Sequence, residues 1–117
     1  MAEAAPLTVT EAARRLGLSI CASGDRMDAA ITGAQVSDLL SYVMAQGKAG
    51  HLWITIQAHP NIVAVAALTG LAGIVVAGGF VPNEEAVARA EEEGVPLLTS
   101  PESAYTIAGR LYELGIR

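Results

Sequence analysis

The stretch from Ala49 to Asn83 constrains the fold most, because it contains no Asp, Glu, Lys or Arg. A polar island, Gln57-Ala58-His59-Pro60-Asn61, separates two apolar runs within it. The stretch is therefore either a membrane segment or a buried strand–loop–helix–strand unit whose polar tip lies at a site. The choice between them decides the class of the protein.

The apolar run from Ile62 to Val81 has roughly the 20 residues that a bilayer span needs, but its composition favours a soluble domain. Its Ile74-Val75-Val76 cluster is β-branched, and neither end has a basic cluster or an aromatic belt. Four glycines interrupt the run: Gly70, Gly73, Gly78 and Gly79. We expect no membrane span. The chain also opens without a basic segment followed by an apolar one, so we expect a cytoplasmic protein.

The length and composition of the chain agree with one small domain spanning residues 1–117. A chain of this length buries roughly 65% of its unfolded surface on folding, which is enough for a hydrophobic core that needs no disulfide or structural metal. The single cysteine, Cys21, lies in an apolar run and is expected to be a packed thiol rather than a nucleophile. A net charge of −5 with seven Lys and Arg argues against a nucleic-acid partner. An anionic ligand would have to be held mainly by backbone amides and helix ends.

The periodicity of apolar residues alternates between that of helices and that of strands. The Thr8–Glu11 spacing is a capping box and predicts a helix that ends at Gly17. A second helix, capped by Ser37 or Asp38, is expected to bury Leu39, Leu40, Val43 and Met44. Further helices are expected at Pro60–Leu68, Glu84–Glu93 and from Ser100-Pro101 onward, with strands at Leu18–Ala22, Ala30–Val36, Leu52–Ile56, Ala72–Ala77 and Val95–Leu98. Buried strands separated by helices imply an α/β fold with a parallel sheet and right-handed crossovers.

This architecture predicts where a site lies. Ligands of open parallel sheets bind beyond the carboxyl ends of the strands, where helix N-termini point their free N–H groups. Polar residues follow the predicted strands at those positions. They are Ser37 and Asp38, then Gln57, His59 and Asn61, and finally Thr99 and Ser100.

Each candidate also has a purely structural explanation. Ser37, Asp38, Thr99 and Ser100 stand where helix caps stand, and His59-Pro60-Asn61 can be a stiff strand-to-helix turn. His51 and His59, without a cysteine or second carboxylate at ligand spacing, make a weak zinc site, so we expect no metal and no cofactor. Asp38 and His59 form an acid–base pair only if their loops meet.

Two segments make the chain resemble a known family. The residues Val36-Ser37-Asp38-Leu39-Leu40-Ser41 and Trp53-Ile54-Thr55-Ile56-Gln57-Ala58-His59-Pro60-Asn61 resemble those of stand-alone DRTGG-domain proteins, and the likeness extends over almost the whole chain. The motif that names the family falls at residues 28–34. Here Ala29 stands in the place of its Arg and Ala34 in the place of its second Gly, so the chain departs from the motif at these two positions.

The resemblance implies a fold and a role more than a reaction. DRTGG domains are similar to the N-terminal domain of HPr kinase/phosphorylase, which is a three-layer α/β/α unit with a mainly parallel sheet. In the larger proteins that contain them, DRTGG domains look like non-catalytic modules for dimerisation or ligand sensing, and the resemblance implies the same role here. The positions that match its shared segments, and that we therefore expect at a ligand site, are Gly33, Ser37, Asp38, Gln57, His59 and Asn61.

The predicted helix from Ile62 to Leu68 has no polar face, so something other than solvent must cover it. The cover is either the rest of the monomer or a second subunit across a two-fold interface. We therefore expect a homodimer that uses this helix, unless the helix is buried within one chain.

Three functions remain at this point. The first is a non-catalytic, homodimeric regulatory module that binds a small anionic ligand, such as a nucleotide, at the carboxyl edge of the sheet. The second is a structural adaptor that docks onto a partner protein and binds nothing small. The third, which the residues support least, is an acid–base enzyme using Asp38 and His59.

Overall fold

The computed structural model describes residues 6–117 and contains five helices in this range. They are α1 (Val9–Leu16), α2 (Leu40–Gln46), α3 (Asn61–Thr69), α4 (Glu84–Glu93) and α5 (Ala104–Glu113). The first helix forms as the capping box predicts, because the Thr8 side chain accepts a hydrogen bond from Glu11 N at 3.1 Å. Gly17 ends this helix with a φ of 65°, a left-handed conformation that favours glycine.

The five strands form one mixed sheet in the order β1-β5-β4-β3-β2. They are β1 (Ser19–Ala22), β2 (Gly33–Val36), β3 (His51–Thr55), β4 (Gly73–Val76) and β5 (Leu97–Thr99). Neighbours from β2 to β5 are parallel, and β1 pairs antiparallel with β5 at one end of the sheet. The carboxyl ends of β2, β3, β4 and β5 therefore lie along one edge, as the strand–helix alternation predicts.

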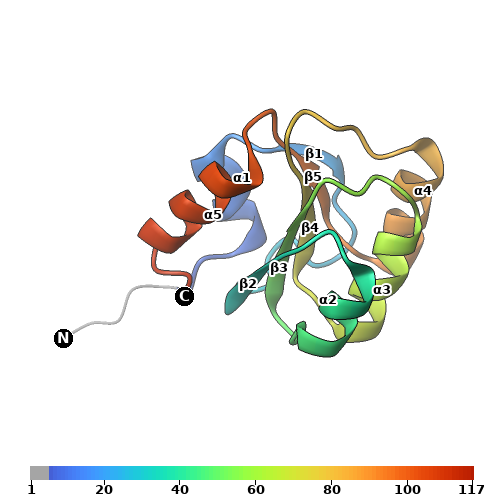
Figure 1. Ribbon diagram of the computed structural model, residues 1–117, viewed down its shortest axis with the longest axis horizontal. Coiled ribbons are helices and arrows are strands. Elements are labelled where there is room, and N and C mark those ends of the chain that lie inside the picture. Colours follow the sequence, from blue (N-terminus) through green and yellow to red (C-terminus); the bar gives the residue numbers. More distant parts are fainter. Residues whose placement is uncertain (1–5) are drawn as a thin grey trace.

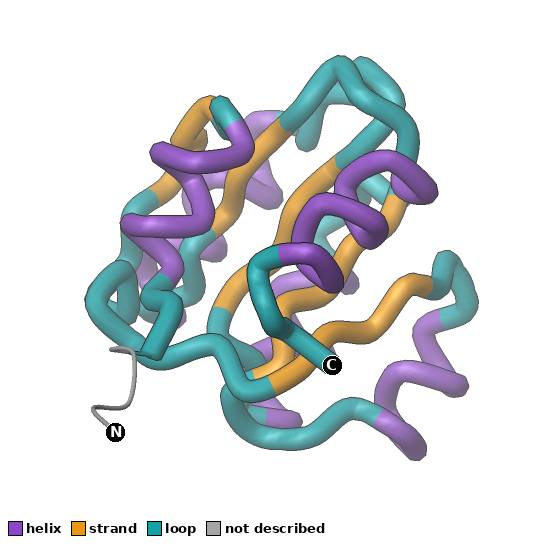
Figure 2. Tube along the Cα trace, turned by 90° about the vertical axis from the view of Figure 1, so that its left-hand side faces the viewer, coloured by secondary structure: helices purple, strands orange, loops and turns teal. Residues whose placement is uncertain are grey.

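The helices form two layers on opposite faces of the sheet (Figures 1 and 2). Helices α1 and α5 cover one face, and α2, α3 and α4 cover the other. A separate hydrophobic cluster fills each interface: Leu16, Ile54 and Ile107 belong to the first, and Trp53, Ile62 and Ile74 to the second. The three-layer α/β/α prediction is confirmed.

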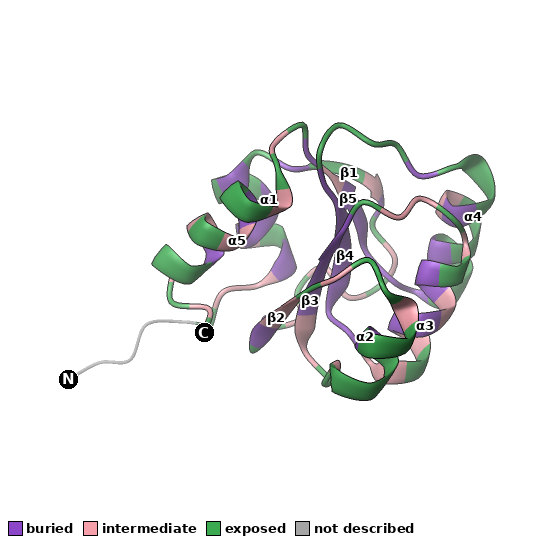
Figure 3. Ribbon diagram, in the orientation of Figure 1, coloured by how far each residue is buried: buried purple, intermediate pink, exposed green. Residues whose placement is uncertain are grey.

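The central strands account for the uncharged stretch of the sequence. Trp53, Ile54, Ile74 and Val75 have no exposed surface, and Figure 3 shows the middle of the sheet buried between the two helical layers. A strand buried on both faces reads as a continuous apolar run, which explains the hydropathy from β3 to β4. Within residues 6–117, none of the helices has the length and apolar character needed to cross a bilayer.

Helix α2 begins later, and buries less, than predicted. Its N-cap is Leu39, which makes no side-chain capping bond, so neither Ser37 nor Asp38 caps it. Val43 is its one buried residue, whereas Leu39 and Met44 are exposed by 63% and 43%. The prediction failed because Asp38 bonds to the neighbouring strand instead, which leaves a short helix with a single side facing inward.

The last helix also begins later than predicted. Ser103, not Ser100, caps α5, with Ser103 Oγ accepting from Thr106 N at 3.1 Å. Ser100 is 3% exposed and continues the sheet, because Ser100 N donates to Val76 O at 3.0 Å. The Ser100-Pro101 pair therefore belongs to the connection that leads into the helix.

Most of the apolar surface of helix α3 is buried within the monomer. Ile62, Val63, Val65 and Ala66 are buried between α2, α4 and the sheet. Leu68, exposed by 76%, is the large apolar residue that remains at its surface. The missing polar face is thus explained by burial within one chain, and it no longer argues for a dimer through this helix.

Candidate functional site

The candidate site is the carboxyl edge of the sheet, where four connections lie in the order of their strands. Hydrogen bonds join the connections after β2 and β3. Asp38 Oδ1 accepts from Thr55 Oγ1 and from Ile56 N, both at 2.8 Å, and Asp38 O accepts from Gln57 Nε2 at 3.1 Å. The structure therefore brings Asp38 and Gln57 together as predicted.

Ser37 belongs to the same group of contacts. Its carbonyl oxygen accepts from Trp53 Nε1 at 2.8 Å, and its hydroxyl accepts from Leu39 N at 3.1 Å. The buried indole thus fixes the turn that carries Ser37 and Asp38. A polar group that is occupied in this way stabilises the loop and is less available to a ligand.

His59 and Asn61 lie at the start of α3, and both are exposed. His59 Nδ1 accepts from Asn61 N at 3.1 Å, and His59 O accepts from Ile62 N at 3.1 Å. The amides at this helix end are therefore bonded within the protein, which weakens the expected backbone site for an anion.

Ser100 meets the connection after β4, whereas Thr99 is the last residue of β5 and pairs in register with Val76 of β4. Ser100 Oγ accepts from Glu102 N and Ser100 O accepts from Gly79 N, both at 3.0 Å, while Gly78 N donates to Glu102 O at 2.7 Å. Farther along that connection, Asn83 N donates to Ala58 O at 3.1 Å. The edge is thus tied together from β5 across to β3.

Gly33 is not part of this edge. It begins β2, at the opposite end of the strand, and pairs in register with His51 at the start of β3. A Cβ atom at Gly33 would lie 2.7 Å from His51 Nε2, so this position lacks a side chain to admit the imidazole ring. The structure separates Gly33 from the other predicted site residues.

Asp38 and His59 do not form an acid–base pair. Within residues 6–117 no hydrogen bond joins them, and each is bonded to a different partner. No cluster of three metal-binding side chains occurs in the same range.

The most important residue that the sequence interpretation missed is Thr55. It is 1% exposed, and its hydroxyl donates to Asp38 and accepts from Gln57 N at 3.1 Å. The sequence feature that could have identified Thr55 is its single hydroxyl in the apolar run Trp53-Ile54-Thr55-Ile56, because a buried polar side chain needs hydrogen-bond partners.

An apolar feature of the edge was also missed. Ile56 and Phe80 are exposed by 42% and 52%. Both lie against Gly78: a Cβ atom there would meet Phe80 Cδ2 at 3.4 Å and Ile56 Cγ2 at 3.7 Å. With a φ of 74° at Gly78, the turn holds the Phe80 ring and the Ile56 side chain against the same glycine.

The family model of the DRTGG domain matches residues 11–114. The chain belongs to the DRTGG-domain family. No curated protein matches the chain.

Among solved structures, this DRTGG domain is similar to the CBS and DRTGG domains of the regulatory region of Clostridium perfringens pyrophosphatase, which were crystallised with the activator diadenosine tetraphosphate. The TM-score is 0.70 at 17% sequence identity, and the match covers 90% of this chain and 45% of that chain. The DRTGG domain described here thus spans less than half of that regulatory region, and at this identity the likeness concerns the fold.

Proposed function

We propose that the chain is a non-catalytic regulatory module that senses a small, ring-bearing metabolite, such as a nucleoside or nucleotide, at the carboxyl edge of its sheet. The observation that carries this proposal is the pair of exposed apolar side chains, Ile56 and Phe80, around Gly78. Aromatic side chains stack on nucleobases, with a typical gain of about 1–3 kcal/mol per base. Membership of the DRTGG family and the activator of the Clostridium perfringens protein support the same class of function.

The charges of the edge limit how such a ligand binds. The connections at 37–39, 56–60, 77–83 and 99–103 contain Asp38 and Glu102 but no Lys or Arg. Arg110 reaches this edge from α5, but its guanidinium is already paired with Glu102 at 2.6 Å, so we propose that the ring and sugar contact the edge while any phosphate stays in solvent. This revises the expected recognition of an anionic group.

Thermal unfolding of the chain with adenosine, AMP, ATP and diadenosine tetraphosphate tests the proposal. A ligand at 100 times its dissociation constant stabilises the folded state by about 2.7 kcal/mol. We expect stabilisation by at least one member of the panel, with adenosine binding no more weakly than AMP. Phe80→Ala should remove the effect.

The matched control is Val81→Ala, because Val81 is the neighbouring residue and is exposed by 73%. This variant should keep the ligand response. The proposal fails if none of the four compounds raises the unfolding temperature, or if Val81→Ala and Phe80→Ala lower the response equally. A response that requires phosphate and survives Phe80→Ala would instead support anion recognition elsewhere.

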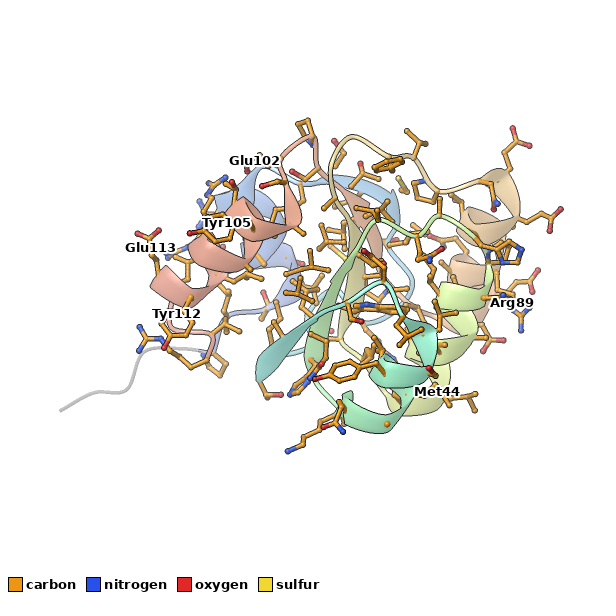
Figure 4. The ribbon with its side chains drawn as sticks, in the orientation of Figure 1. Met44, Arg89, Glu102, Tyr105, Tyr112 and Glu113 are labelled. Carbon is orange, nitrogen blue, oxygen red and sulfur yellow. The ribbon has the colours of Figure 1, made fainter. Side chains whose placement is uncertain are left out.

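An adaptor that docks onto a partner protein is the second candidate, and the outer face of α5 favours it. Tyr105 and Tyr112 are exposed by 88% and 59%, and they flank Gly109 on the side of α5 turned away from the sheet (Figure 4). Tyrosine is enriched in the cores of protein interfaces. A chain that responds to no ligand but loses a co-purifying partner on Tyr105→Ser would favour this function.

A further inference from the structure

A glycine inside α5, Gly109, has no explanation within the fold. It is exposed, its φ lies outside the left-handed region that favours glycine, and a Cβ atom there would meet nothing within 4 Å. Every other glycine of the chain has a left-handed φ or a close neighbour, as Gly33 has in His51. Glycine weakens the interior of a helix relative to alanine, so Gly109 lowers stability without any gain in packing. Such a position favours close approach by something outside the chain.

Two exposed tyrosines lie on either side of Gly109. Residues 105, 109 and 112 recur at helical spacing, so Tyr105 and Tyr112 share a face with the glycine and lie about 10 Å apart along the helix axis. Figure 4 shows both side chains on the outer side of α5. With Thr106 and Glu113 they line an open hollow of about 540 Å³. We call it the α5 hollow.

The α5 hollow already holds a guanidinium of its own chain. Arg117 Cζ lies 4.3 Å from the centroid of the Tyr112 ring, and Arg117 Nε donates to Tyr112 O at 3.2 Å. A cation over the face of an aromatic ring is attracted by the quadrupole of the ring. Tyr105 presents the same kind of ring, and no cation within residues 6–117 lies over it. The two tyrosines therefore favour an occupant that brings cations.

The charges around the α5 hollow favour the same kind of occupant. Glu113 lines the hollow, and no cation within residues 6–117 forms an ion pair with it. Arg110 also lines the hollow, but it is paired with Glu102 at 2.6 Å. Arg15 lines a separate hollow, between α1 and α5. The net charge of −5 adds a long-range attraction for a basic segment.

We propose that the α5 hollow docks an arginine-bearing segment of a partner protein. One guanidinium of the segment stacks on the Tyr105 ring, and a second displaces Arg117 from the Tyr112 ring, close to Glu113. Arginine suits this role because its planar guanidinium stacks on aromatic faces. In a polyproline II segment, residues three apart lie on one face about 9 Å apart, which matches the spacing of the two tyrosines. The missing side chain at Gly109 lets the backbone of the segment approach the helix between them.

This inference names the chemistry of the partner for the docking role given to α5 above, and it rests on that role. Ligand sensing at the carboxyl edge of the sheet is independent of it.

The test titrates the chain with the peptide acetyl-Pro-Arg-Pro-Pro-Arg-Pro-amide and follows binding by NMR. The prolines favour the polyproline II conformation and place both arginines on one face. The amide signal of Gly109 and the ring signals of Tyr105 and Tyr112 should shift. Citrulline has nearly the shape of arginine without its charge, so a peptide with citrulline at both positions should leave these signals unchanged.

Two substitutions should change the affinity for the arginine peptide in opposite directions. Gly109→Ala fills the space between the tyrosines, so it should weaken binding while it raises the unfolding temperature, a combination that a purely structural glycine would not give. Arg117→Ala frees the Tyr112 ring and should tighten binding about two- to fivefold, which is what one cation–π contact at an exposed site contributes. The matched control is Arg89→Ala on α4, which removes the same charge in the layer on the other face of the sheet (Figure 4) and should tighten binding less.

Equal binding of the arginine and citrulline peptides overturns the inference, because the hollow then takes an uncharged partner or a second copy of the chain. So does a Gly109→Ala variant that binds as tightly as the wild type, or an Arg89→Ala variant that tightens binding as much as Arg117→Ala. If neither peptide binds but Tyr105→Ser still loses a co-purifying partner, the docking role stands and the chemistry inferred for the partner is wrong. None of these results affects the ligand test at Phe80, which lies on the connection after β4.

Discussion

At the scale of single residues, Thr55 explains why the candidate edge has one fixed shape. Its buried hydroxyl donates to Asp38 and accepts from Gln57 N, so one side chain satisfies groups on two connections. Leaving such a group without a partner typically costs about 1–3 kcal/mol, which favours the single arrangement in which all of these bonds form. These bonds hold the connections after β2 and β3 in one arrangement relative to each other.

His51 gives the protein a pH dependence that can be measured. Its pKa is lowered, mainly by burial and further by the positive charge of Lys48, while Gln35 Nε2 donates to its Nδ1 at 3.2 Å. The unfolded chain therefore binds this proton more readily than the folded one. The stability that neutral His51 contributes is complete above its unfolded pKa of about 6.5 and is lost as the pH falls through the lower folded value.

Urea unfolding at a series of pH values from about 7.5 to 5 checks this prediction. The free energy of unfolding should decrease as the pH falls through this range. His51→Gln has no proton to bind at this position and should show a smaller decrease. An equal decrease in both proteins would show that other groups cause the pH dependence.

At the scale of secondary-structure elements, helix starts show what a sequence can and cannot predict. The repeat of apolar residues placed all five helices and five strands close to where they lie, because burial on one or both faces fixes that repeat. It could not choose between Ser100 and Ser103 as the cap of α5. That choice depends on Val76, which bonds to Ser100 N from a neighbouring strand.

The same limit applies to the candidate edge. Strand order brings Ser37, Asp38 and Gln57 to one place, and this could be predicted because parallel strands end at one edge. The partners of Asp38 could not, since Thr55 and Ile56 are seventeen or more residues away along the chain. Nor could the approach of Ile56 and Phe80 to the same glycine, which depends on the left-handed turn at Gly78.

Helix capping provides a prediction at this scale. Ser103→Ala removes the hydroxyl that accepts from Thr106 N and should lower the free energy of unfolding by about 1 kcal/mol. Ser37→Ala is the matched control, because its hydroxyl accepts from Leu39 N in a turn that caps no helix. Chemical denaturation should show a smaller loss for Ser37→Ala. A larger loss for the control would mean that the turn after β2 matters more than the cap of α5.

At the scale of the whole molecule, the position of a strand in the sheet predicts how strongly its backbone is protected. Strand β4 lies in the centre, paired on both sides, and Ile74, Val75 and Val76 are fully buried. Its amides should exchange with solvent most slowly, because they open only with the whole domain. The strands at the two ends of the sheet, β1 and β2, should exchange faster.

Hydrogen exchange read by NMR compares the strands directly. Equal rates in the central strand β4 and in the end strands β1 and β2 would mean that the centre and the ends of the sheet open together.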